Sequence, residues 1–157
     1  MLSKKYYLSI LFSVFILIFW VNAKVLKIGV HRNAPVNKWI APSYTDTLVS
    51  PILPEPIHLQ NGKRIYAMEC EVCHGKWGNG DGEAGFGLSV SPGDLNHKGV
   101  LAESDGSLFW KIYTGKKPMP SFNAKLDTTE IWQVVLYIRL VQSENQFKGS
   151  HKRKRKK

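Results

Sequence analysis

The stretch that decides the fold of this 157-residue sequence is Cys70-Glu71-Val72-Cys73-His74. A helical pattern begins near Ile57 or His58 and runs through Cys73. One face of that pattern recurs at spacings of three and four residues and holds Leu59, Gly62, Tyr66, Cys70 and Cys73. The two thiols are therefore expected one helical turn apart on the same face, with a histidine directly after them.

Three kinds of site use a Cys-x-x-Cys pair. A thioredoxin-like redox pair belongs to a βαβ context, whereas this pair comes late in a helical pattern with no strands around it. A zinc site needs further ligands, and none of the other histidines has finger-like spacing: His31, His58, His97 and His151. Histidine directly after the second cysteine is typical of c-type haem attachment, in which each thiol adds across one vinyl group of the porphyrin. The motif favours one covalent haem c on Cys70 and Cys73, with His74 ligating the iron.

The second axial ligand is sought among three methionines. Met1 belongs to the N-terminal signal, and Met68 is too close in sequence to Cys70 to reach the opposite face of the ring. Met119 follows His74 by 45 residues and stands between two prolines that stiffen its loop. A thioether ligand favours ferrous iron and raises the reduction potential. We expect Met119 to ligate the iron, with His97 as the alternative.

The net charge of +10 is concentrated at the two ends of the chain. Seven Lys and Arg residues lie within 148–157, and Lys4 and Lys5 precede an apolar run. Without these nine, 13 basic residues stand against 12 acidic ones, so the body of the chain is nearly neutral. This distribution argues against a nucleic-acid-binding domain. The length excludes a large multidomain enzyme, and two cysteines exclude a disulfide-rich scaffold.

The N-terminal segment has the order of an export signal. Lys4 and Lys5 precede an uncharged stretch of 18 residues, 6–23, which ends in the small residues of a cleavage site. The same length is at the lower limit for a retained membrane anchor. Residues 1–23 are therefore a signal peptide or an N-terminal anchor, and the rest is exported, periplasmic, and either soluble or membrane-associated. Residues 24–56 contain five of the eight prolines and are expected to form an extended lead-in along the domain.

Two further helices follow the motif. A Gly-rich loop at 75–87 and a turn at 91–94 lead to a helix over Ser104–Thr114 that ends at Gly115. The next helix starts at Asp127, where Asp127-Thr128-Thr129-Glu130 has the form of a capping box, and continues through Val141. No alternating strand pattern is present. We expect an all-α domain over 57–142, with three main helices around one haem, and a basic, disordered tail over 143–157.

On these residues the chain resembles the class I c-type cytochromes over 57–142. Gly62 and Tyr66 match the glycine and aromatic residue of that family's first helix, and Val134 and Tyr137 match its last helix. The resemblance implies that these two helices cross closely. Similar loop motifs are His74-Gly75 with Gly78-Asn79-Gly80-Asp81-Gly82, Pro92-Gly93-Asp94-Leu95, Asp105–Ile112, and Gly115 with Pro118–Phe122. In the family a proline carbonyl orients the axial histidine, for which Pro92 is the candidate here.

The resemblance implies the cytochrome c fold, one haem c, ligation by His74 and Met119, and single-electron transfer between redox protein partners. The chain is thus expected to be an electron carrier and not an enzyme by itself. One alternative is the haem-bearing subunit of a larger respiratory or dehydrogenase complex, in the membrane or beside it. Another is a haem sensor or peroxidase-like protein with an open sixth site. Candidates for the haem wall are aromatic: Trp77, Phe86, Phe109, Trp110, Tyr113 and Phe122.

The basic tail has a separate set of expected partners. Because the body of the chain is nearly neutral, the tail is the feature that would provide electrostatic docking. Anionic lipid and an acidic protein are the two candidates. Nucleic acid is not expected as a partner, because the chain is exported.

Overall fold

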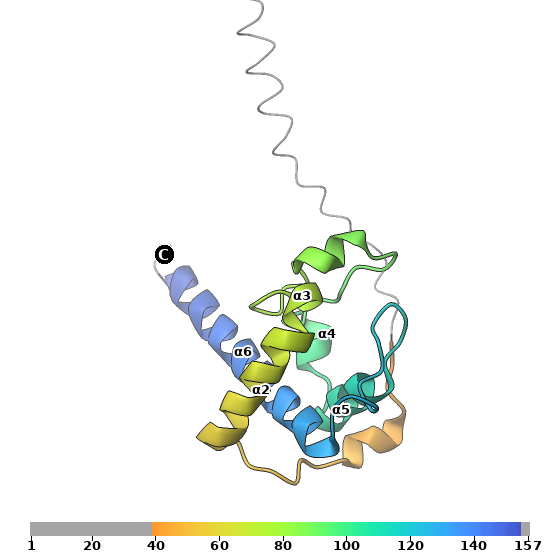
Figure 1. Ribbon diagram of the computed structural model, residues 1–157. Helices are drawn as coiled ribbons and strands as arrows, with labels where there is room; N and C mark the ends of the chain where they lie inside the picture. Colours follow the sequence, from red (N-terminus) through yellow and green to blue (C-terminus); the bar gives the residue numbers. More distant parts are fainter. Residues whose placement is uncertain (1–38, 155–157) are drawn as a thin grey trace, which may run out of the picture. The chain divides into compact units, whose positions relative to one another are not determined.

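The computed structural model describes residues 39–154, with side chains through residue 148. Its elements in chain order are η1 (Ser43–Thr47), α2 (Pro56–Glu69), α3 (Glu71–His74), η2 (Glu83–Gly87), α4 (Lys98–Leu101), α5 (Asp105–Thr114) and α6 (Thr128–Lys154) (Figure 1). Within this range the backbone forms no strand beyond an isolated bridge between Lys116 and Met119. The expected all-α class is confirmed.

Helices α2 and α6 cross at Gly62, as the two can be seen to do in Figure 1. A Cβ atom at Gly62 would lie 2.0 Å from the carbonyl oxygen of Gln133, so only a hydrogen fits there. One turn further along α2, the ring of Tyr66 packs on the ring of Tyr137 with 5.3 Å between centroids. The close crossing that the resemblance implied is therefore confirmed at these residues.

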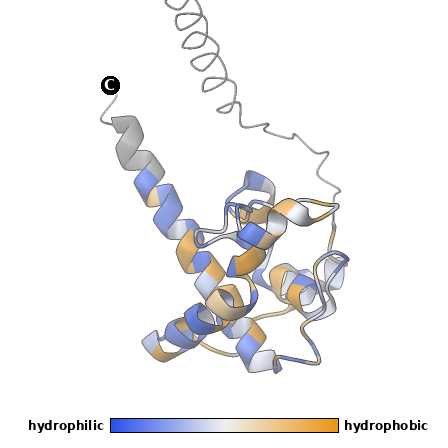
Figure 2. Cartoon of the chain, turned by 45° about the horizontal axis from the view of Figure 1, so that its top comes forward, coloured by the Kyte–Doolittle hydropathy of each residue, from blue (hydrophilic) through white to orange (hydrophobic). Residues whose placement is uncertain are grey.

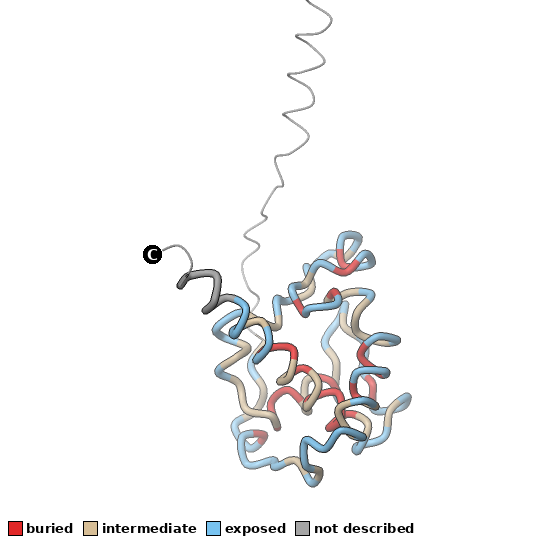
Figure 3. The backbone as a smooth tube through the Cα atoms, turned by 90° about the vertical axis from the view of Figure 1, so that its left-hand side faces the viewer, coloured by how far each residue is buried: buried red, intermediate tan, exposed pale blue. Residues whose placement is uncertain are grey.

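The buried core lies where α2, α5 and α6 meet, and Figure 3 shows buried residues along all three helices. Phe109 of α5 stacks on Trp132 of α6 with 4.5 Å between ring centroids. Burial on this scale supplies most of the driving force for folding, because each large apolar side chain contributes about 1.5–3 kcal/mol. The cluster of buried residues is Ile65, Tyr66, Leu108, Ile112, Phe122, Ile131, Trp132, Val134, Val135 and Ile138.

The N-termini of α5 and α6 are both capped, and the capping box predicted at Asp127 is confirmed. Asp127 Oδ1 accepts from the Glu130 backbone N–H at 2.8 Å, and Glu130 Oε2 accepts from the Asp127 N–H at 3.0 Å. This reciprocal pair is a capping box and satisfies two backbone donors that the helix itself leaves free. The Ser104 hydroxyl caps α5 in the same way, accepting from the Ser107 N–H at 3.1 Å.

Helix α6 is longer than predicted. We expected disorder from residue 143 onward, but α6 continues to Lys154, so this prediction is wrong for residues 143–154. No proline interrupts the segment, and it contains six good helix formers: Glu144, Gln146, Lys148, Lys152, Arg153 and Lys154. Figure 2 shows how hydrophilic residues take over in the later turns of α6. Residues 155–157 of the predicted tail lie outside the described residues.

The described part of the Pro-rich lead-in packs along α5, as expected. Trp39 contacts Trp110 with 6.2 Å between ring centroids. Thr45 is fully buried in η1, and its hydroxyl lies 3.0 Å from the hydroxyl of Ser107. A Cβ atom at Gly106 would lie 2.0 Å from the Thr45 carbonyl oxygen, so the first turn of α5 directly contacts the lead-in. The short helix η1 itself was not predicted.

Among the described helices, none combines the length and the apolar character needed to cross a membrane. The predicted signal peptide or anchor at 1–23 and the lead-in residues 24–38 lie outside the described residues.

Candidate haem-attachment site

Cys70 and Cys73 lie at the junction of α2 and α3. The expected helix ran unbroken through Cys73, whereas the structure divides it at Cys70, whose φ of −113° departs from the helical value. The Cys70 carbonyl still accepts from the N–H groups of Cys73 at 3.1 Å and His74 at 2.8 Å. Both cysteines are half-buried, and neither forms a disulfide. Two reduced thiols thus lie within one turn of backbone, with the imidazole immediately after them.

The His74 ring is oriented by a backbone carbonyl. Its Nδ1 lies 3.3 Å from the carbonyl oxygen of Gly93. A carbonyl only accepts, so Nδ1 carries the proton and Nε2 keeps the lone pair that binds a metal. The prediction that Pro92 provides this carbonyl is wrong by one residue, because the turn at 91–94 directs the Gly93 oxygen to the ring. Pro92 instead packs beside Gly85, where its Cγ would lie 2.9 Å from an added Cβ.

The loop after His74 folds back against α3. Gly80 N–H donates to the His74 carbonyl at 2.8 Å, and Gly82 N–H donates to the Cys73 carbonyl at 3.1 Å. The buried Tyr66 hydroxyl donates to the Gly75 carbonyl at 2.7 Å. These bonds satisfy the carbonyls that a short helix leaves unpaired at its C-terminus. The turn over residues 70–75, here called the attachment turn, is therefore held on one side by backbone contacts from the loop and on the other side by the Tyr66 hydroxyl of α2.

Burial keeps the donor groups of the site neutral. It raises the pKa of the Cys70 thiol to about 12, with smaller contributions from the charges of Glu69 and Cys73. It also lowers the pKa of His74, although the hydrogen bond to Gly93 opposes this shift. A protonated thiol and a neutral imidazole are the forms in which thiol addition to a vinyl group starts and in which histidine ligates iron.

Met119 lies in a tight turn docked on the end of α5. Lys116 N–H donates to the Met119 carbonyl at 3.0 Å, and Met119 N–H donates back to Lys116 at 2.8 Å. The Ser121 hydroxyl donates to the carbonyl of Tyr113 at 2.8 Å, which ties the following residues to α5. Met119 and Cys70 are both half-buried and pack against the same core cluster. Met119 and Cys70 therefore both contact the apolar core of the fold.

The other candidate ligands lie elsewhere. His97 is exposed, and its Nδ1 accepts from the Gly99 N–H as the cap of α4. Met68 is more than half exposed on α2. Neither arrangement presents the side chain to the apolar region that Cys70 and Met119 share.

The candidate wall aromatics have different surroundings. Phe122 belongs to the buried core, and Phe109 stacks between Trp132 and Tyr113. Trp110 packs on the lead-in and Phe86 is 82% exposed. Tyr113, predicted in the haem environment, is 38% exposed on α5 with its ring 5.9 Å from that of Phe109. The role of each toward a haem stays a prediction.

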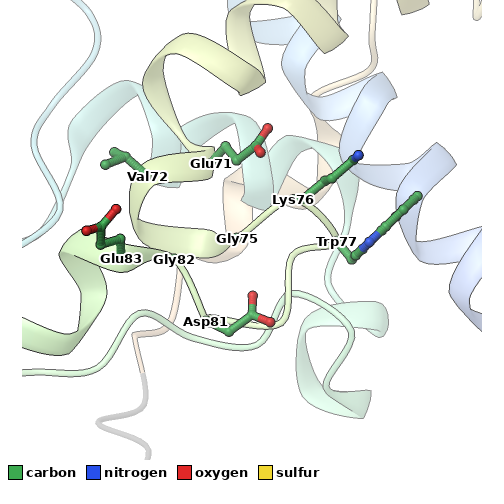
Figure 4. A pocket seen from close by; sticks show the side chains of 8 residues that line it. All are labelled: Glu71, Val72, Gly75, Lys76, Trp77, Asp81, Gly82 and Glu83. Carbon is green, nitrogen blue, oxygen red and sulfur yellow. The ribbon is translucent and has the colours of Figure 1, made fainter.

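A shallow pocket beside the motif is separate from the donor groups. Figure 4 shows its lining, which comes from α3, from the loop that follows and from the first residue of η2: Glu71, Val72, Gly75, Lys76, Trp77, Asp81, Gly82 and Glu83. Cys70, Cys73 and His74 do not line it. Trp77, which lies at the edge of the pocket, makes cation–π contacts with two lysines. Lys148 Nζ lies 4.1 Å and Lys76 Nζ lies 5.5 Å from the centroid of its ring. The pocket is therefore an outer surface of the attachment turn.

Sequence reasoning missed Gly93, Asn96 and Asn145. Gly93 holds His74, while both asparagines donate to the carbonyl of Trp77 in the loop after His74, at 2.9 and 3.0 Å. No motif marks these residues, because all three contacts involve backbone carbonyls, which every residue possesses. The sequence motif Pro92-Gly93-Asp94 correctly indicated which loop lies beside His74, but it did not indicate which carbonyl of that loop faces the ring.

The residues of this site fit a covalent haem. Two free thiols on one turn match the two vinyl groups, and the imidazole is held in the tautomer that leaves Nε2 free for iron. The described residues contain no group of three or more His, Cys, Asp or Glu side chains arranged for a metal ion alone. The donor set suits a porphyrin iron better than a zinc ion.

Comparisons with known proteins agree with this chemistry. The family described as cytochrome c oxidase, cbb3-type, subunit III matches residues 58–138. Cytochrome c6 of Alaria esculenta is 28% identical over 92 residues, which cover 56% of this chain and 95% of that protein. Cytochrome c6 of Bumilleriopsis filiformis is 30% identical over 91 residues, which cover 55% of this chain and 93% of that protein.

A solved structure is also similar. A chain of the reducing HAO-like protein complex of Kuenenia stuttgartiensis matches with a TM-score of 0.54 and 28% identity. The match covers 67% of the present chain and 52% of that chain, so the similarity extends over about half of the solved one.

Proposed function

Because the chain belongs to the family of cytochrome c oxidase, cbb3-type, subunit III, and so to the class I c-type cytochromes, we propose that it is a mono-haem single-electron carrier. The cytochrome c fold, a covalent haem c and a part in electron transfer follow from that membership. The proposal adds that one haem is bound, that Cys70 and Cys73 attach it, and that His74 and Met119 are its axial ligands.

The observation that carries the proposal is the arrangement at the α2–α3 junction. The two thiols and the imidazole occupy one turn, and the Gly93 carbonyl fixes the ring with Nε2 free. When bound, the haem supplies an iron that alternates between Fe(III) and Fe(II) and so takes up and releases one electron. The chain's own contribution is to fix the ligands and to keep them in an apolar region, which limits the rearrangement that accompanies a change of charge.

Met119 is the proposed sixth ligand because of where its turn lies. The paired backbone bonds with Lys116 and the contact of Met119 with the core cluster hold the thioether on the same apolar region as Cys70. A soft thioether stabilises ferrous iron and raises the reduction potential. An electron carrier gains from this arrangement, because a filled sixth position keeps small molecules off the iron.

Spectroscopy of the holoprotein tests the ligation. The ferric wild-type protein is expected to be low-spin and to show the near-infrared charge-transfer band of a methionine–iron bond. Met119→Ala should abolish the band and lower the reduction potential, whereas Met68→Ala, at an exposed position on α2, should leave both unchanged. A high-spin wild-type protein without the band would contradict Met119 ligation and favour the sensor or peroxidase-like alternative.

The second candidate function is that of an electron-transferring subunit in a larger protein complex. The matched family is described as an oxidase subunit, and the similar solved chain belongs to a protein complex. We propose redox proteins outside the cytoplasm as the electron donor and acceptor, in keeping with the predicted export signal at 1–23. Purification from membranes and from the soluble periplasmic fraction, followed by haem staining of native gels, separates a free carrier from a subunit. A haem band at the mass of the single chain supports the carrier, and a larger band supports the subunit.

A further inference from the structure

Two loops meet at the axial histidine. The loop 75–82 follows His74 directly, and the loop 91–96 carries Gly93, whose carbonyl holds the His74 ring. We propose that Asn145 of α6, acting through Asn96 and Trp77, and Gln142 of α6, acting through Leu95, position these two loops against each other and so set the His74–Gly93 hydrogen bond and the reduction potential. This inference rests on the proposed haem ligation by His74, and it does not depend on Met119.

The first contact joins the loops at Trp77. Its carbonyl oxygen accepts from Asn96 Nδ2 at 2.9 Å and from Asn145 Nδ2 at 3.0 Å. Asn145 Nδ2 also lies 2.9 Å from Asn96 Oδ1, and Asn96 Nδ2 donates to Asn79 Oδ1 at 3.1 Å. One amide of α6 is therefore shared between the loop after His74 and the loop that carries Gly93.

The second contact fixes the Gly93 loop to α6 at a buried position. Gln142 is 3% exposed, and its Nε2 donates to the Leu95 carbonyl at 2.6 Å. Its Oε1 accepts from Arg139 Nη1 at 2.9 Å, and Arg139 Nε donates to Asp105 at 2.7 Å. A buried amide whose donor and acceptor are both used has one orientation, so Leu95 is held in place two residues after Gly93.

The loops also bond to each other. Leu95 N–H donates to the Gly78 carbonyl at 2.7 Å, so the two loops share one backbone hydrogen bond beside the amides. The His74–Gly93 distance of 3.3 Å lies at the long end of the hydrogen-bond range. At that length a small displacement of either loop weakens the bond strongly, so residues that fix the loops also control it.

The sign of the effect follows from ligand chemistry. A hydrogen bond from Nδ1 makes the imidazole a more basic ligand, which favours Fe(III) over Fe(II). Weakening that bond therefore raises the reduction potential. General loosening that admits water near the iron has the opposite effect, because water stabilises the more highly charged ferric form. The two explanations predict shifts of opposite direction.

The experiment compares Asn145→Ala with Gln146→Ala in the holoprotein. Gln146 is the next residue of α6 and is exposed, so it controls for an alanine at this part of the helix. Asn145→Ala should shift the Fe(II)/Fe(III) equilibrium threefold to tenfold toward Fe(II), which is about +30 to +59 mV for one electron. NMR of the reduced protein should show roughly tenfold faster solvent exchange of the His74 Nδ1 proton. Gln146→Ala should match the wild type in both.

Asn145→Leu is the second variant, because it keeps a similar side-chain size while removing the donor without adding a charge near the iron. It should shift the potential and the exchange rate in the same directions, with circular dichroism confirming a helical protein. An unchanged or lowered potential in both Asn145 variants, or an unchanged exchange rate, overturns the inference while leaving the carrier function standing. A chain that takes up no covalent haem at Cys70 and Cys73 overturns both proposals.

Discussion

The absence of a side chain at Gly62 lets α2 approach α6 closely. The carbonyl oxygen of Gln133 occupies the space in which any side chain at this position would begin. The neighbouring contact of Tyr66 with Tyr137 depends on that approach, and the Tyr66 hydroxyl in turn donates to the Gly75 carbonyl directly after His74. The identity of residue 62 is thus linked through α2 to the attachment turn.

Gly62→Ala should destabilise the folded protein by about 1–3 kcal/mol, because the added methyl group meets backbone that must shift. The matched control is Gly87→Ala, where an added Cβ would meet no atom within 4 Å. That control should change stability by no more than about 0.5 kcal/mol. Denaturant unfolding of both holoproteins measures the difference, and equal stabilities would contradict the close crossing.

At the scale of residues, the motif of Cys70, Cys73 and His74 led to the cytochrome c family that the comparisons show, whereas haem attachment at these two thiols stays a prediction. The spacing of Cys70, Cys73 and His74 is a direct requirement of the porphyrin, so it is readable without a structure. The carbonyl that meets the histidine depends on the backbone angles of the turn, and the prediction was off by one residue, at Pro92 instead of Gly93. Ligation by Met119 stays a prediction that the spectra above test.

At the scale of elements, the lead-in and α5 are joined by a small polar network that is buried at Thr45 and Ser107 and exposed at Asp46. Asp46 Oδ1 accepts from the hydroxyls of Ser104 at 2.6 Å and Ser107 at 3.1 Å, and Thr45 lies beside Ser107. The Thr45 hydroxyl also donates to the Pro42 carbonyl at 2.7 Å. The cap of α5 is therefore shared with a segment that precedes it by nearly 60 residues.

Thr45→Val tests whether this network stabilises the fold. The variant keeps the shape of the side chain but removes the hydroxyl, which should lower the free energy of unfolding by about 1–2 kcal/mol. Thr47→Val is the control, because the Thr47 hydroxyl is exposed and bonds only to the nearby Tyr44 carbonyl. If thermal and denaturant unfolding give the same stability for both variants, the lead-in does not contribute as described.

The elements themselves were predictable to different degrees. Local signals located both ends of α5 and the start of α6, because a cap is a short-range interaction written in adjacent residues. The packing of η1 on α5 could not be predicted, since it depends on partners distant in sequence, whereas the extension of α6 was missed although the composition of 143–154 favours a helix. Asn145 and Lys148 of α6 contact Trp77, and only the folded chain brings them together.

At the scale of the whole molecule, the positive charge is separated from a nearly neutral body. Residues 148–157 carry seven basic side chains, and α6 extends into this segment as far as Lys154. Its first lysine is placed over Trp77, in the loop that follows the attachment turn. A partner that binds the basic segment would therefore lie close to the loop after His74.

Truncation after Phe147 tests docking by this segment. It removes seven positive charges and lowers the formal net charge from +10 to +3. The full chain should co-sediment with vesicles containing anionic phospholipid at low ionic strength and be released by salt, and the truncated chain should bind much less. Zwitterionic vesicles provide the control, and the haem spectrum should be the same for both chains. Equal binding by both chains would contradict lipid docking and leave an acidic protein as the candidate.

Mass spectrometry can establish whether a single haem is covalently attached at the α2–α3 junction. The protein, produced with a haem-attachment system, is extracted with acidified acetone to remove any non-covalent haem and then digested. We predict one haem per chain, retained on the peptide that contains Cys70 and Cys73 through two thioether bonds. Covalent attachment would be ruled out if the same peptide carried free thiols or a disulfide and the haem were found in the extract.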